Sequence, residues 1–229
     1  MTAQSPTAAQ GKNIQIWDNI YKSGSTLWYP AEALVRLVRR HESQEGFSGM
    51  ILDHGCGTGN VSEFLSRSGH NVHCTEVSAE ALTVVRQRYA KAGLPAPEVT
   101  LINPELDLPP QLPRYNHVIA WQSLCYGPRP STISNLAQLV AGLPSGGCII
   151  VCFPTPKDLL YRYSQPLNDG SRQFVQVNSG QLGAVLTIPE SEEELRSWCK
   201  GIEVRDVVEY GMRFSGEQNQ FYALYGVKE

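Results

Sequence analysis

The sequence has no long hydrophobic run, little charge and no strongly basic segment. Its 229 residues are 18% charged, with 19 Lys and Arg against 22 Asp and Glu. No stretch approaches the roughly 20 apolar residues of a membrane span, and no charged and apolar leader stands at the start. Basic residues gather only at Arg39-Arg40 and at Arg86 and Arg88. We therefore expect neither a membrane nor a nucleic acid as partner.

Cysteines are present but not in a pattern typical of metal sites or disulfide frameworks. The six thiols form no C-x-x-C pair and lie mostly in apolar, strand-like runs. This indicates buried, reduced thiols in a cytoplasmic protein with no metal site. A hydrophobic content of 41% in 229 residues suits one domain with a sizeable core.

The most informative stretch is Met50–Asn60, with the sequence M-I-L-D-H-G-C-G-T-G-N. An apolar run ends at Asp53, glycines follow at 55, 57 and 59, and a helical pattern begins after them. This order predicts a strand, a tight turn and a helix. Glycine permits positive φ and a close approach of backbone to ligand, and the helix start adds free N–H groups.

Two cofactor classes use such a turn. The dinucleotide fingerprint G-x-G-x-x-G would need a third glycine at position 60 or 62, which are Asn60 and Ser62. The pattern D-x-G-x-G-x-G instead resembles motif I of the class I S-adenosylmethionine (SAM)-dependent methyltransferases. An ordinary strand–helix turn of an α/β fold is the alternative.

The resemblance implies SAM as the cofactor, with S-adenosylhomocysteine as its product. It places the glycine turn under the methionine part of SAM and gives the opening acid a contact there. The residues implied are Asp53, Gly55, Cys56, Gly57, Gly59 and Asn60.

Glu76 ends the second expected strand, 23 positions after Asp53. Adjacent parallel strands bring it beside the glycine turn, where its carboxylate can accept both ribose hydroxyls. An N-cap role is the alternative, but Ser78 suits that role better. In the family, the residue at Val77 packs on the adenine. Where the family has an aspartate for the adenine amino group, this sequence reads Asn103-Pro104-Glu105. Asn103 or Glu105 could supply an equivalent acceptor.

The segment after the fourth expected strand crosses the carboxyl edge of the sheet, where ligands of α/β folds bind. We assign Trp121 and Gln122 to the cofactor side, and Ser123, Tyr126 and Gly127 to the acceptor side. For Trp121, a core role is an equal alternative.

The N-terminal part resembles the lid of small-molecule methyltransferases through W-D-x-x-Y and Y-P-x-x-x-L-V-R. The resemblance brings Trp17 and Tyr21 to the cofactor, and turns Trp28 and Tyr29 toward cofactor or acceptor. A cap packed on the core is the alternative. The domain boundaries predicted are a mobile tail (1–13), a helical lid (14–46) and a SAM-binding domain (47–229). Within the last, 154–189 is a substrate-side insertion that offers Tyr161 and Tyr163 to the acceptor.

The expected fold is α/β, a doubly wound and mostly parallel seven-stranded sheet of the Rossmann-like methyltransferase type. Strands over Ile202–Tyr210 and Phe221–Val227, joined by the loop Gly211–Asn219, form its antiparallel C-terminal hairpin. A smaller hairpin is expected over Arg172–Val177 and Gly183–Ile188, and Ser131 is expected to cap a helix from Thr132.

The favoured function is transfer of a methyl group from SAM to an O or N atom of a small molecule by in-line displacement. No catalytic base is identified, and His54 and His117 are assigned structural roles. The alternatives are a SAM-binding protein that does not transfer methyl groups, and a protein or RNA methyltransferase. Composition leaves monomer and homodimer open.

Overall fold

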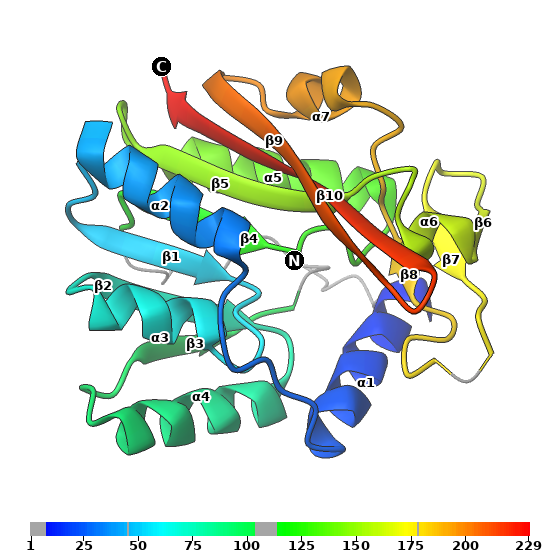
Figure 1. Cartoon of the computed structure of the whole chain (residues 1–229), viewed down its shortest axis with the longest axis horizontal. Helices are drawn as coiled ribbons and strands as arrows, with labels where there is room; N and C mark the ends of the chain where they lie inside the picture. Colours follow the sequence, from blue (N-terminus) through cyan, green and yellow to red (C-terminus); the bar gives the residue numbers. More distant parts are fainter. Residues whose placement is uncertain (1–7, 45, 104–113, 178) are drawn as a thin grey trace, which may run out of the picture.

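The computed structural model describes residues 8–44, 46–103, 114–177 and 179–229 (Figure 1). Its main sheet has seven strands in the order β3-β2-β1-β4-β5-β10-β9. The strands are β1 (Met50–His54), β2 (Asn71–Glu76), β3 (Glu98–Leu101), β4 (His117–Trp121), β5 (Cys148–Pro154), β9 (Ile202–Phe214) and β10 (Glu217–Lys228). β1 to β5 are parallel, and β10 runs antiparallel to both β5 and β9. The expected Rossmann-like methyltransferase sheet is confirmed.

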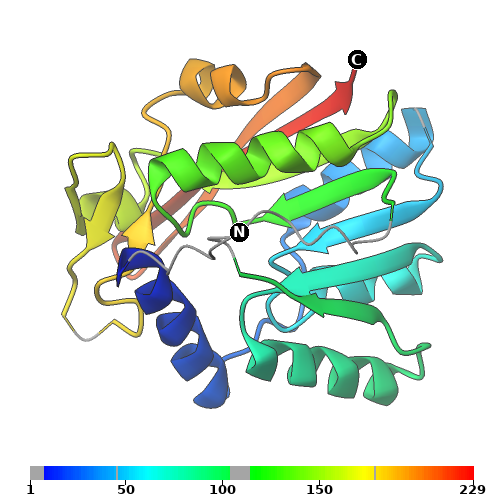
Figure 2. The same ribbon diagram turned by 180° about the vertical axis from the view of Figure 1, so that it is seen from behind.

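Seven helices occur in the described residues. They are α1 (Ala8–Lys22), α2 (Glu32–Gln44), α3 (Asn60–Arg67), α4 (Ala79–Ala92), α5 (Arg129–Gly142), α6 (Leu159–Arg162) and α7 (Glu192–Trp198). Successive side chains of a strand point to opposite faces. Ile150 of β5 accordingly packs with residues of α2, α3 and α4, and its neighbour Ile149 with residues of α5 and α7. Seen from behind, α5 crosses in front of the sheet (Figure 2).

A second, three-stranded sheet lies beside the carboxyl end of the first, in the order β6-β7-β8 (Figure 1). Its strands are β6 (Ser164–Pro166), β7 (Arg172–Phe174) and β8 (Val185–Leu186). The predicted smaller hairpin is therefore present as the β7–β8 pair, with shorter strands than expected. Helix α1 stands next to this sheet, and Asn13 joins the two by accepting from Val185 N (2.8 Å) and donating to its carbonyl (2.9 Å).

Three boundaries differ from expectation. Residues 8–13, which we placed in the terminal tail, form the first turns of α1. Helix α5 begins at Arg129, before the expected cap Ser131, because Pro130 in its first turn needs no N–H partner. Most of the expected loop Gly211–Asn219 is strand: Ser215 (φ 53°) and Gly216 (φ 85°) make a tight turn with positive φ at both positions, as in type I′ hairpins.

Candidate active site

The glycine turn joins β1 to α3 with left-handed backbone at three positions. Gly55, Gly57 and Gly59 have φ values of 69°, 53° and 84°. A Cβ on Gly55 would lie 2.4 Å from Ser123 Cβ, and one on Gly57 would lie 3.0 Å from the Tyr21 hydroxyl. Both the backbone conformation and the close neighbours therefore require glycine.

Glu76 lies buried directly beneath this turn. Its carboxylate accepts hydrogen bonds from Gly57 N (2.8 Å), Val77 N (2.7 Å) and Ser78 N (3.1 Å). Burial raises the pKa of the Glu76 carboxyl, although the three N–H donors act in the opposite direction. Ser78 caps α4 through Ala81 N, as expected, so Glu76 is not needed for that task.

Asp53 is 1% exposed, and its Oδ2 has no hydrogen-bond partner in the described part of the chain. Burial, and next the charge of Glu76, raise the pKa of Asp53 to about 7. A buried carboxylate oxygen without a donor is costly. Such an oxygen is expected where a ligand completes the site.

Helix α1 brings Trp17 and Tyr21 to the glycine turn. Trp17 stacks on Tyr21 with ring centroids 5.6 Å apart and meets the ring edge of Tyr126 at 4.7 Å. Ser78 donates a hydrogen bond to Asp18 and ties the helix to the start of α4. Burial raises the pKa of the Tyr21 hydroxyl, so it stays protonated at neutral pH.

The segment after β4 lies on the side of the glycine turn opposite α1. Gln122 has a positive φ of 53°, and the Ser123 hydroxyl donates to the His54 carbonyl at 2.6 Å. His54, which was assigned a structural role, also lines this space. Burial lowers the pKa of His54 to about 4, so its imidazole is neutral; Nδ1 lies 3.0 Å from the Thr75 hydroxyl.

These elements enclose a cavity of about 780 Å³, counted out to its open mouth. Nine predicted site residues line it: Trp17, Tyr21, Gly55, Glu76, Val77, Gln122, Ser123, Tyr126 and Gly127. Eight further residues were missed as site residues: Asn13, Ile14, His54, Ile102, Leu124, Ser131, Thr132 and Asn135. The spacing of Ser131, Thr132 and Asn135 at a helix start was a usable signal, since it places polar groups on one face.

Other predicted residues lie next to the cavity or away from it. Asp53, Cys56, Gly57, Gly59, Trp121 and Asn103 are not among the lining residues, and Pro104 and Glu105 lie outside the described residues. Asn60 turns outward and donates to the Tyr29 carbonyl. Tyr161 and Tyr163, expected at the acceptor, instead donate to Glu190 and Glu217.

The expected orientation of Trp28 and Tyr29 is wrong in this structure. They are 67% and 84% exposed and line a separate surface groove over α3 and α4. Arg88 causes this arrangement, because its guanidinium donates to the carbonyls of Leu27 and Trp28 and pairs with Glu63. The backbone is held inward and the aromatic side chains point out.

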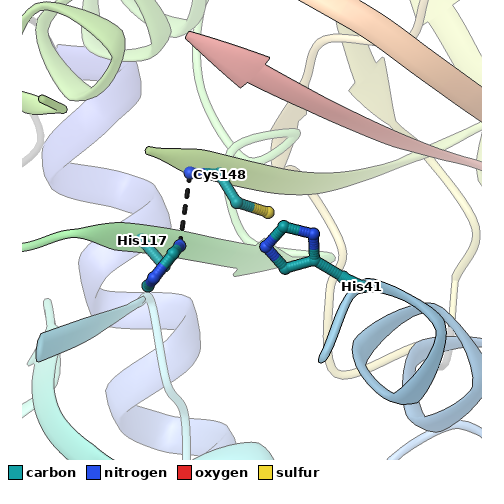
Figure 3. Close-up of side chains that lie close together, drawn as sticks. All are labelled: His41, His117 and Cys148. Atoms are coloured by element: carbon teal, nitrogen blue, oxygen red, sulfur yellow. Dashed lines mark hydrogen bonds between the residues drawn. The ribbon is translucent and has the colours of Figure 1, made fainter. Parts of the chain in front are cut away.

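A second group of buried polar side chains lies at the amino edge of the sheet (Figure 3). His41, His117 and Cys148 offer ligand atoms within 4.8 Å of one another. His117, however, bonds through both ring nitrogens, with the Ser48 carbonyl at 2.9 Å and with Cys148 N at 3.3 Å. A metal could bind His117 only by breaking one of these bonds. The contacts of the group match a packed hydrogen-bonded cluster, with Phe47 stacked on His117.

The sequence model of the family described as "Methyltransferase domain" matches residues 51–147, from β1 to the turn before β5. The match spans 97 of the 229 residues and identifies a methyltransferase domain in this part of the chain. The expectation of SAM as the cofactor agrees with this match and with solved structures of SAM-dependent methyltransferases, one of which holds bound SAM. No curated protein matches the sequence of this chain significantly.

Solved structures share the methyltransferase fold. One, described for conversion of a disulfide bond into a thioacetal group during echinomycin biosynthesis, has a TM-score of 0.69 at 19% identity and covers 94% of this chain and 91% of its own. A SAM-dependent methyltransferase from Methanosarcina mazei has a TM-score of 0.66 at 19% identity, and the match covers 83% of this chain and 96% of that protein. The magnesium protoporphyrin IX methyltransferase from Synechocystis, solved with bound SAM, has a TM-score of 0.57 at 15% identity. The match covers 99% of this chain and 87% of that protein. At these identities the likeness concerns the fold.

Within the described residues, no helix of this methyltransferase combines the length and apolar character that a bilayer crossing requires.

Proposed function

We propose that this methyltransferase transfers the methyl group of SAM to an O or N atom of a small molecule. The observation that carries the proposal is the cavity beside the glycine turn, walled by Trp17, Tyr21 and Tyr126 and covered by α1. Its lining surface is mainly apolar and aromatic, with polar groups set among it, as in small-molecule sites. A macromolecular substrate would need an open groove, whereas α1 covers this cavity.

The residues at one end of the cavity fit SAM. In the proposed arrangement, the Glu76 carboxylate accepts from the ribose hydroxyls, and Val77 and Ile102 flank the adenine. Gly55 and Gly57 leave room for the methionine part, and the orphaned Asp53 oxygen accepts from its ammonium, directly or through water. Trp17, Tyr21 and Gln122 complete the cofactor side, and Ser123 and Tyr126 face the acceptor.

Bound SAM supplies an electrophilic methyl carbon on a positively charged sulfur. The chain's own contribution is to hold the acceptor in line with that carbon and to exclude water. Trp17 and Tyr126 meet edge to face and form an apolar wall for this purpose. His54 is neutral, and Tyr21 and Tyr126 keep their protons because burial raises the pKa of each hydroxyl. These described groups favour positioning over strong base catalysis.

Two structural neighbours support a small-molecule acceptor by analogy, since one acts in echinomycin biosynthesis and another on magnesium protoporphyrin IX. We further propose a cytoplasmic location, supported by six buried cysteines without disulfides. Monomer and homodimer both remain compatible with the proposed function.

The test begins with calorimetric titration of the chain with S-adenosylhomocysteine, with NAD as the control ligand. Binding of the first alone is expected. Labelled SAM is then incubated with separate panels of small amines and hydroxyl compounds, and with protein and RNA. Label in a small molecule, lost in Glu76→Ala, supports the proposal. Label only in protein or RNA, or no binding of S-adenosylhomocysteine, would refute it.

A further inference from the structure

Gln122 holds an unusual backbone conformation at the cavity wall. Among the described residues, only Gln122 and Ser215 combine positive φ with a side chain. Ser215 belongs to a tight hairpin turn, which explains its conformation. Gln122 directly follows β4 at the carboxyl edge and lines the cavity. Left-handed backbone is unfavourable for a residue with a side chain, so neighbouring contacts must hold Gln122 there.

Tyr210 supplies such a contact from the other end of the chain. The Gln122 side-chain amide donates to the Tyr210 hydroxyl at 3.2 Å, and that hydroxyl lies 3.3 Å from Cys152 Sγ. The Tyr210 ring is fixed on both sides, stacked 5.5 Å from Trp121 and 5.4 Å from Phe221. Tyr210 belongs to β9, the edge strand of the sheet, and does not itself line the cavity.

We propose that Tyr210 is a positioning residue for methyl transfer, because its hydroxyl fixes the Gln122 side chain and thereby the cavity wall beside the glycine turn. The inference rests on the proposed function, since it assumes that SAM occupies this cavity. The proposal also gives the long C-terminal hairpin a role in activity. Strand β9 positions the Tyr210 ring at the carboxyl edge, where β4 ends at Trp121 and Gln122 follows.

The test compares Tyr210→Phe with Tyr222→Phe. The first keeps the stacked ring and removes the hydroxyl. Tyr222 lies on neighbouring β10, and its hydroxyl has no hydrogen bond within the described ranges, so it controls for a generic hydroxyl loss. Tyr210→Phe should weaken S-adenosylhomocysteine binding by about 3- to 10-fold, the effect of one buried hydrogen bond. Tyr222→Phe should leave the affinity within twofold, and both should melt near the wild-type temperature.

A double-mutant cycle separates positioning from a general structural role. Gln122→Ala should weaken binding at least as much as Tyr210→Phe, and the second substitution should add less than twofold to the first. Full additivity, or unchanged affinity in Tyr210→Phe, would overturn the inference. Should Tyr210→Phe fold poorly, an unchanged affinity in Gln122→Ala would overturn it equally. Failure of the wild-type chain to bind S-adenosylhomocysteine would instead refute the proposed function, and this inference with it.

Discussion

His117 at the amino edge of the main sheet and Asp53 at its carboxyl edge differ in how their buried polar atoms are satisfied. At the amino edge, His117 bonds through both ring nitrogens, and Figure 3 shows its bond with Cys148 N. His41 Nδ1 lies 2.5 Å from the Tyr225 hydroxyl, and Phe47 stacks on His117. At the carboxyl edge, Asp53 keeps an oxygen without a partner in the described chain, and Gln122 is held with positive φ.

This contrast separates stability from function. A buried polar group that has its hydrogen bonds strengthens the fold and needs nothing further. An orphaned carboxylate oxygen and a strained residue lower stability, and they persist where a ligand or a reaction benefits from them. The comparison therefore supports a site at the carboxyl edge independently of the family, and it predicts that substitutions at the two edges affect different measurements.

Glu76→Ala should have the largest effect at the carboxyl edge. It removes the proposed acceptor of the ribose hydroxyls and leaves the N–H groups of Gly57, Val77 and Ser78 without their acceptor. Loss of two charge-assisted bonds predicts binding weaker by at least ~100-fold. Calorimetry with S-adenosylhomocysteine measures this. Glu80→Ala, in the first turn of α4, is the matched control. Affinity within tenfold of wild type in Glu76→Ala would remove Glu76 from the site.

His117→Ala tests the amino edge and should change stability without changing binding. It leaves a cavity under Phe47 and removes the partners of Ser48 O and Cys148 N. We expect the free energy of unfolding to fall by about 3 kcal/mol, measured by urea denaturation. Affinity for S-adenosylhomocysteine should stay within twofold. His70→Ala, which breaks a contact with Glu42 near the surface, should cost under ~1 kcal/mol. Weaker S-adenosylhomocysteine binding in His117→Ala would show that the amino edge does not serve stability alone.

Asp53→Asn should raise stability while it lowers affinity. Burial raises the pKa of Asp53 from its ordinary 3.8 to about 7. The folded chain thus binds this proton more tightly than the unfolded chain, so the contribution of Asp53 to stability is full below pH 4 and is lost as the pH rises to about 7. The stability gained by Asp53→Asn should therefore grow between pH 4 and 7 and then level off.

Thermal unfolding of the wild type and Asp53→Asn across that pH range measures this gain, and calorimetry should show binding about tenfold weaker in the variant. A gain that is constant with pH would mean that Asp53 is ionised throughout. Unchanged affinity would mean that its orphaned oxygen does not serve the ligand.

Local sequence rules were sufficient to predict the conformation of the glycine turn and the position of Glu76 beside it. Positive φ at Gly55, Gly57 and Gly59 follows from the tightness of a strand–helix turn, and two adjacent parallel strands bring Glu76 beneath it. The order of the apolar runs along the chain was also sufficient to predict the fold of the main sheet. These features depend on residues near one another in sequence or on a topology common to the class.

Features set by distant contacts could not be predicted in the same way. The neutral state of His54 depends on its burial in the finished cavity, and the link from Gln122 to Tyr210 spans 88 positions. Trp28 and Tyr29 look like ligand-facing aromatics in sequence. Their orientation is decided by Arg88, about 60 positions away, which bonds the backbone and leaves the rings outside.

The smallest effects should come from those two aromatics. Trp28→Ala and Tyr29→Ala alter exposed rings outside the cavity, so S-adenosylhomocysteine affinity and methyl transfer should change by less than about twofold. Trp17→Ala, which opens the aromatic wall, should reduce transfer by more than about tenfold and serves as the comparison. Labelled-SAM turnover with the accepted small molecule measures all three. A large loss in Tyr29→Ala would mean that the linker leaves Arg88 and turns inward during the reaction, because in the present arrangement its ring cannot reach the cavity.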